Sequence, residues 1–187
     1  NIIDVSMTDV SYSLSVIPQS IVKNTNHQIS NGKYVLNGAV PCYNIYRCKD
    51  GYISVGSLEP KFWKMLCLNI LNAPHLVNKG MIMGQKGDKI KNQVENIFMS
   101  KTCNEWKPII ARTDCCVEII PQNIKQVSNS QLIKDRDLDI DITINHPNNG
   151  KSQRITVPKS PLNMLEGVEF QCKGGPSKIG QDNKEIL

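Results

Sequence analysis

The sequence predicts a mixed α/β chain whose main part is a small α+β domain of β-hairpins and helices. Apolar and polar residues alternate on both sides of a Lys49-Asp50-Gly51 turn and again over residues 138–144, which is the period of half-buried strands. Between these strand pairs, apolar residues recur at helical spacing over residues 60–70 and 90–98. The chain has 187 residues, which is enough for one or two small cores.

The first part of the chain is expected to hold a strand, a helix and a linker. Ile2–Val5 is a short apolar run typical of a buried strand. Met7–Ile17 carries apolar residues at helical spacing, and we expect Pro18 to end this helix. Gln19–Asn37 is rich in Asn, Ser and Lys, which predicts a linker.

A β-hairpin is predicted after the linker. Tyr43 and Ile45 alternate with Asn44 and Tyr46, so we expect a strand that is buried on one face. Tyr52–Gly56 is the expected partner strand, because the glycine-containing turn before it favours a hairpin.

Three helices are predicted between the hairpin and about Arg112. Pro60–Asn69 is expected to be helical because its first residue, a proline, fits the first helical position, where no N–H is needed. Ile90–Met99 has apolar residues on one face. Thr102 and Glu105 have the spacing of a capping box and predict a further helix to about Arg112. A loop is expected at Asn72–Asp88, a strand at Cys116–Ile120 and a helical turn at Pro121–Val127. Leu138–Ile144 and Ser152–Val157 are expected to be strands joined by an Asn148-Asn149-Gly150 turn. Lys159–Leu187 is expected to be extended and to begin a helix near Gly180.

Composition excludes several classes of function. The net charge is +5, but the lysines are scattered and aromatic residues make up only 5% of the chain, so no nucleic-acid surface is expected. The sequence has no apolar run of the roughly 20 residues that span a bilayer, and it has no signal peptide pattern. A membrane span is therefore not expected.

No metal site is expected from the sequence spacing. The seven cysteines include a vicinal Cys115-Cys116 pair but no CxxC, and the three histidines add no ligand pattern. Reduced, mostly buried thiols are the simplest interpretation. Asp135, Asp137, Asp139 and Asp141 lack the glycine and final glutamate of an EF-hand loop, so strand alternation explains them better.

Glu59 is the carboxylate that stands out from local structure. It lies between the second hairpin strand and the start of the Pro60–Asn69 helix, where free N–H groups and the helix dipole favour negative charge. A surface helix cap is the ordinary interpretation of such a residue.

A wider pattern around Glu59 points to a family. Residues 38–63 read GAVPCYNIYRCKDGYISVGSLEPKFW, and the pattern GAxPxYxxYRxxDGxxxVGxxEPxFW within them resembles the alpha-methylacyl-CoA racemases, a branch of the family III CoA-transferase superfamily. NIIDVSMTDV at residues 1–10, TCNEWKPIIARTDCCVEII at residues 102–120 and GQDNKEIL at residues 180–187 are similar to segments of the same family. The resemblance runs over nearly the whole chain.

The resemblance implies a domain organisation. Residues 1–18 would end a Rossmann-like large domain, residues 19–37 would be the linker, and residues 38–128 would form the small α/β domain. Residues 129–187 would form a β-hairpin and a segment that returns to the large domain. The chain opens at Asn1 within a strand-like run, so we expect a fragment that lacks the amino-terminal half of such a protein.

The resemblance also implies an activity, the racemisation of 2-methylacyl-CoA thioesters by removal and return of the α-proton. A His, an Asp and a Glu act in the family, and only the Glu has a match here, Glu59, which would tune the His or act in the proton relay. His27, His75 and His146 match none of the catalytic positions. Tyr43 and Tyr46 would line the acyl pocket, although core packing explains tyrosines equally well.

Partners and alternatives follow from the same resemblance. Coenzyme A would enter as part of the substrate, with no separate cofactor, and the protein would form an interlocked homodimer that brings Glu59 to the partner's large domain. The location would be cytoplasmic in a bacterium and mitochondrial or peroxisomal in a eukaryote. A family III CoA-transferase and a non-catalytic dimerisation segment remain as alternatives; the Glu59-Pro60 pair favours the racemase branch.

Overall fold

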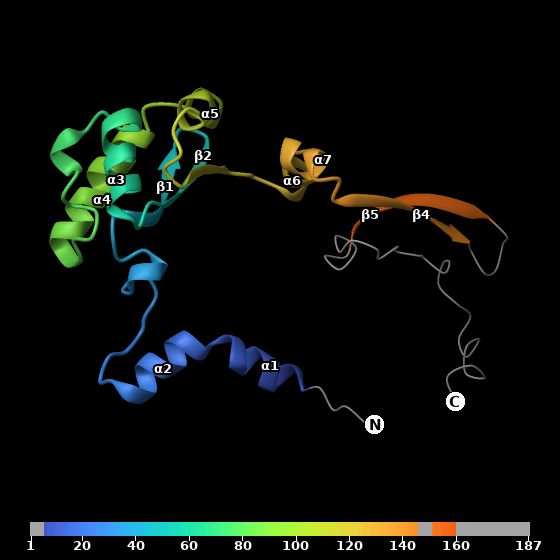
Figure 1. Cartoon of the computed structure of the whole chain (residues 1–187), viewed down its shortest axis with the longest axis horizontal. Helices are drawn as coiled ribbons and strands as arrows, with labels where there is room; N and C mark the ends of the chain where they lie inside the picture. The colour runs from blue at the N-terminus through green and yellow to red at the C-terminus, as the bar shows by residue number, and fades with distance from the viewer. Residues whose placement is uncertain (1–5, 146–150, 160–187) are drawn as a thin grey trace. The chain divides into compact units, whose positions relative to one another are not determined.

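A computed structural model describes residues 6–145 and 151–159 (Figure 1), which fall into two compact units, 1–120 and 121–187. The strand expected at Ile2–Val5, the Asn148-Asn149-Gly150 turn and the helix expected near Gly180 lie outside the described residues. None of the helices in the described ranges is long and apolar enough to span a membrane.

Two helices, α1 (Met7–Leu14) and α2 (Val16–Asn24), open the described part of the chain. The prediction of one helix ended by Pro18 was wrong. The break falls at Ser15, and Pro18 lies in the first turn of α2, where a missing N–H leaves no helical hydrogen bond unmade. The first residues of the expected linker are therefore helical, and neither helix buries a side chain.

The first unit contains a three-stranded antiparallel sheet in the order β1-β2-β3. Its strands are β1 (Tyr43–Cys48), β2 (Gly51–Gly56) and β3 (Val117–Ile120). Tyr43 pairs with Gly56 and Val55 pairs with Val117. The predicted hairpin and third strand are both confirmed.

The expected facing of β1 was wrong, although its period was right. Tyr46 and Cys48 are buried, whereas Ile45 is 58% exposed. The Tyr46 ring lies 5.6 Å from that of Phe98, and its hydroxyl donates a hydrogen bond of 2.6 Å to the carbonyl of Pro41. The large aromatic ring of Tyr46, whose hydroxyl is hydrogen-bonded, is therefore more favourable in this core than the side chain of Ile45.

Helices cover the buried face of the sheet. The predicted helix at Pro60–Asn69 is α3 (Pro60–Met65) continued by a π-helical turn, η2 (Leu66–Ile70). The helix α4 (Gly84–Phe98) begins before the expected Ile90 and packs on β1, while α5 (Cys103–Ile110) packs on β2 and β3 (Figure 1). The capping box of α5 is confirmed. Two short 3-10 turns, η1 (Val35–Asn37) and η3 (Pro74–Leu76), complete the unit.

Both tryptophans lie in the core of the first unit. Trp63 donates its indole N–H to the carbonyl of Leu76 at 2.9 Å, and Trp106 donates to the carbonyl of Phe98 at 2.8 Å. These bonds satisfy the polar group of each buried ring, which would otherwise cost free energy. The same core cluster includes the buried residues Ile53, Leu66, Cys67, Leu76 and Val94.

The second unit contains two short helices, α6 (Ile124–Ser128) and α7 (Gln131–Asp135), and a two-stranded antiparallel sheet of β4 (Asp139–Asn145) and β5 (Ser152–Pro158). Both predicted strands are confirmed. Asp141 accepts hydrogen bonds from Arg154 at 2.6 Å and from Thr156 at 2.7 Å across the pair. The described residues of this unit include no buried side chain.

Candidate functional site

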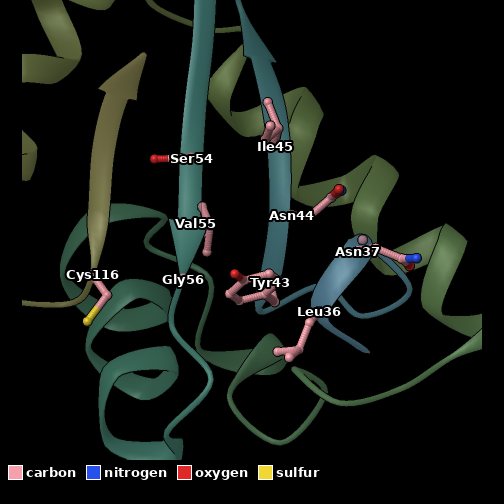
Figure 2. Close-up of a pocket in the computed structure, with 10 residues that line it drawn as sticks. Leu36, Asn37, Tyr43, Asn44, Ile45, Ser54, Val55, Gly56 and Cys116 are labelled. Carbon is pink, nitrogen blue, oxygen red and sulfur yellow. The ribbon is translucent and has the colours of Figure 1, made fainter. Parts of the chain in front are cut away.

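A hollow of about 530 Å³ lies where β1 begins and β2 ends (Figure 2). Among the lining residues, Figure 2 shows Leu36 on η1, Tyr43 on β1 and Cys116, the residue immediately before β3. The lining of the hollow is mostly apolar, which suits an apolar part of a ligand better than a charged one. The lining residues are Leu36, Asn37, Gly38, Tyr43, Asn44, Ile45, Ser54, Val55, Gly56 and Cys116.

Backbone geometry shapes this hollow. Gly38 has a φ of +100°, and a Cβ there would lie 3.0 Å from Oδ1 of Asn44, so the position favours glycine. Cys116 has a φ of +57°, a left-handed conformation that is uncommon for a residue with a side chain. Its carbonyl accepts a hydrogen bond of 2.8 Å from the N–H of Gly56, which ties the end of β2 to the start of β3.

The two candidate tyrosines lie in different environments. Tyr43 lines the hollow beside Gly56. Tyr46 does not line it, because its side chain is fully buried in the core. The core-packing alternative therefore holds for Tyr46, and only Tyr43 is placed where it can contact a bound molecule.

Glu59 lies at the corner between β2 and α3. Ser57 fixes this corner, since its buried hydroxyl donates a hydrogen bond of 2.6 Å to the carbonyl of Cys115. Glu59 is the N-cap residue of α3, but its side chain makes no capping hydrogen bond. The carboxylate is exposed and has no hydrogen bond or ion pair to any residue in the described ranges. It is therefore free to meet a ligand or another chain.

The structure also joins three groups that the sequence spacing left apart. Sγ of Cys48 and Sγ of Cys103 lie 3.3 Å from each other, and Oδ1 of Asp50 lies 3.7 Å from the Cys48 sulfur. The same oxygen accepts the backbone N–H of Cys103 at 2.6 Å. Burial, with Cys48 and Asp50 close by, raises the pKa of Cys103 to about 12. A C-x-D run in the hairpin turn was the one local signal of this cluster.

The remaining described cysteines are mostly packed inside. Cys42, Cys67 and Cys115 are buried and free, and burial raises the pKa of Cys67 to about 12. Burial also raises the pKa of Cys115 to about 11. Such thiols are poor nucleophiles near neutral pH, which agrees with the expected structural role. Cys116 differs because its side chain is exposed.

Comparison with known proteins identifies relatives of this chain. A CaiB/baiF CoA-transferase family protein of Caenorhabditis elegans is 33% identical over 120 residues, which are 62% of this chain and 32% of that protein. Human alpha-methylacyl-CoA racemase is 31% identical over 118 residues, 62% of this chain and 30% of the racemase. A probable fatty acyl-CoA transferase of Mycobacterium tuberculosis, Rv3272, is 26% identical over 102 residues, 52% of this chain and 25% of that protein. The matched region thus spans about a third or less of these relatives.

Solved structures share the fold. A crystal structure of Rv3272 from Mycobacterium tuberculosis superposes with a TM-score of 0.64 at 21% identity, covering 98% of this chain and 46% of that one. A crystal structure of the orthorhombic form of Rv3272 gives a TM-score of 0.60 at 22% identity, covering 86% of this chain and 40% of that one. The model of CoA-transferase family III matches residues 1–183. The chain therefore belongs to CoA-transferase family III.

Proposed function

We propose that the whole protein racemises 2-methylacyl-CoA thioesters by removing the α-proton from one face of the carbon and returning a proton to the other. The observation that carries this proposal is Glu59, a carboxylate held at a fixed strand-to-helix corner with no partner among the described residues. The 31% identity to human alpha-methylacyl-CoA racemase over 118 residues also supports the proposal.

Proton transfer beside a thioester has two requirements. A positioned base must take the α-proton, and donors must stabilise the enolate that forms, because the carbon acid is far weaker than any side-chain acid. Glu59 would orient and tune the catalytic His of the family, or pass the proton within the relay. No residue of this chain matches the family's His or Asp, so those roles fall to a large domain.

The proposed assembly is an interlocked homodimer. In it, Glu59 from the small domain of one chain completes a site on the large domain of the other. The exposure of Glu59 supports this arrangement, because a residue that acts across an interface must be free on the isolated chain. Tyr43 and the apolar hollow beside it would receive the acyl chain, with coenzyme A entering only as part of the substrate.

Exchange of the α-proton in D₂O tests the proposal directly. The whole protein is incubated with a 2-methylacyl-CoA, and deuterium at the α-carbon is followed by mass spectrometry. Glu59→Gln should slow exchange by about 10²-fold or more, the usual contribution of a group in acid–base catalysis. Glu118→Gln, an exposed acid on β3, is the matched control and should exchange at the wild-type rate. Equal rates for both variants would overturn the role of Glu59.

A CoA-transferase is the second candidate, favoured by the similarity to the probable fatty acyl-CoA transferase of Mycobacterium tuberculosis. In that reaction, an aspartate outside the residues matched here would form a mixed anhydride while CoA moves between two carboxylic acids. Incubation with an acyl-CoA and a second, labelled carboxylic acid separates the candidates. Labelled acyl-CoA without α-proton exchange would favour the transferase. If the protein forms no labelled acyl-CoA and exchanges no α-proton, a non-catalytic dimerisation segment is favoured.

A further inference from the structure

The cluster of Cys48, Asp50 and Cys103 lies apart from the residues that carry the proposed function. Cys48 is the last residue of β1, Asp50 lies in the hairpin turn, and Cys103 is the first residue of α5. One ligand atom from each lies within 4.8 Å of the other two. Three side chains that can each bind a metal ion therefore lie together, although they come from two parts of the chain that are distant in sequence.

The distances between these sulfur and oxygen atoms fit ligands of a tetrahedral metal ion better than they fit a disulfide bond. An ion that holds sulfur at about 2.3 Å keeps two tetrahedral sulfur ligands about 3.8 Å apart. Here the sulfur atoms are 3.3 Å apart, and the Cys48 sulfur is 3.7 Å from the Asp50 oxygen. A disulfide would need the sulfur atoms to close to about 2.0 Å and would give Asp50 no part.

The three groups are also well positioned for binding. The N–H of Cys103 holds the Asp50 carboxylate at 2.6 Å, which orients the oxygen toward the sulfur atoms. The adjacent Thr102 and Glu105 form the capping box that fixes the start of α5. The N–H of Lys49 donates to the carbonyl of Lys101 at 3.1 Å and joins the two loops. Ligands held in this way lose little freedom when an ion binds.

We propose that Cys48, Asp50 and Cys103 bind a thiophilic divalent cation of the zinc class, with water as its fourth ligand. Two thiolates and one carboxylate are a donor set that zinc accepts in tetrahedral sites. Cys48 is buried, whereas Asp50 is exposed, so water can reach the fourth position from the side of Asp50. Binding releases the thiol protons, and the bound ion would join the hairpin turn to α5.

Metal titration of the reduced full chain tests the site. Zn²⁺ binding is measured by competition with a chromophoric chelator, and Co²⁺ binding by the visible absorption of tetrahedral thiolate–cobalt complexes. We expect the wild-type chain to bind a single Zn²⁺ and the thermal midpoint to rise when it binds. Cys48→Ser and Cys103→Ser should each weaken binding by about tenfold or more and reduce the cobalt–thiolate band.

Matched controls separate the site from general effects. Cys116→Ser removes an exposed thiol elsewhere and should bind Zn²⁺ like the wild type. Asp50→Asn keeps an oxygen for the N–H of Cys103, so this variant should fold normally yet bind Zn²⁺ less tightly than the wild type. Asp114→Asn, which changes an exposed aspartate outside the cluster, is its control and should bind Zn²⁺ like the wild type. Circular dichroism of the metal-free variants checks folding.

Two results would overturn the proposal. One is a wild-type chain that takes up no Zn²⁺ while oxidised glutathione closes a Cys48–Cys103 disulfide. The other is Zn²⁺ binding that is unchanged in Cys48→Ser, Cys103→Ser and Asp50→Asn.

Discussion

Tyr43 and Tyr46 show how much one strand position decides for a residue. The two side chains are three residues apart on β1, so they point to opposite faces of the sheet. Tyr46 is buried against Phe98, while Tyr43 lines the hollow. The period of β1 is visible in the sequence, but both faces carry an aromatic or aliphatic residue, so the pattern does not say which one is buried.

Tyr46→Phe should destabilise the first unit without altering a site at the hollow. The change removes the hydroxyl that satisfies the carbonyl of Pro41, and a buried polar group without a partner costs about 1–3 kcal/mol. Urea unfolding followed by tryptophan fluorescence measures the loss. Tyr43→Phe is the control, because that side chain is only partly buried at the edge of the core, and an equal loss in both variants would contradict the role of the Tyr46 hydroxyl.

The candidate site was predictable in part. Glu59 stands out because a long pattern surrounds it, whereas a single carboxylate at a helix start is common on surfaces. The pairing of Cys48 with Cys103 had no such signal, because their contact depends on how α5 packs on β2 and β3. Contacts between residues far apart in sequence follow from the fold and not from local spacing.

At the scale of elements, strong periodicity predicted what forms better than where it ends. The hairpin, β4, β5 and the capped α5 are all present. The break between α1 and α2 was missed because Pro18 is compatible with the first turn of a new helix as well as with the end of an old one. The π-helical turn η2 was also missed, since it continues directly from α3 and a single π-helical turn within a helix is rare.

The β4–β5 pair should weaken as pH falls. Hydrogen bonds from Thr156 and Arg154, together with the charge of Arg154, lower the pKa of Asp141 below its ordinary value. A carboxyl whose pKa is lower in the folded state stabilises that state at neutral pH, and this contribution is lost as the pH falls through the lowered pKa and the group is protonated.

Carbon NMR of the carboxyl groups measures this effect. The titration midpoint of Asp141 should lie below that of aspartate in a short peptide, and Arg154→Gln should raise it. Lys134→Ala in α7 is the control and should leave the midpoint in place. A midpoint that does not respond to Arg154→Gln would contradict the role of this ion pair.

At the scale of the whole molecule, the described core belongs to the first unit alone. Every buried hydrophobic residue of the described part lies between Ala39 and Val117. The described residues of the second unit bury none, and an isolated two-stranded sheet is at best marginally stable in water. Cooperative unfolding of this chain should therefore report on the first unit.

A chain that ends at Ser128 should unfold almost like the full chain. We expect its thermal midpoint to differ by less than about 4 °C, the shift that about 1 kcal/mol produces in a small domain. Both tryptophans lie in the retained core, so their fluorescence follows the transition in both chains. A larger drop would mean that residues 129–187 support the core directly.

The Cys115-Cys116 pair before β3 provides a site for a chemical probe of the hollow. Cys115 is buried, whereas Cys116 is the one cysteine of the described ranges with an exposed side chain, and it is among the residues that line the hollow (Figure 2). A maleimide dye should therefore label Cys116 before the other cysteines of the described ranges. Any molecule that fills the hollow would then shield the sulfur from the reagent or change the emission of the attached dye, so occupancy could be read out before any reaction is known.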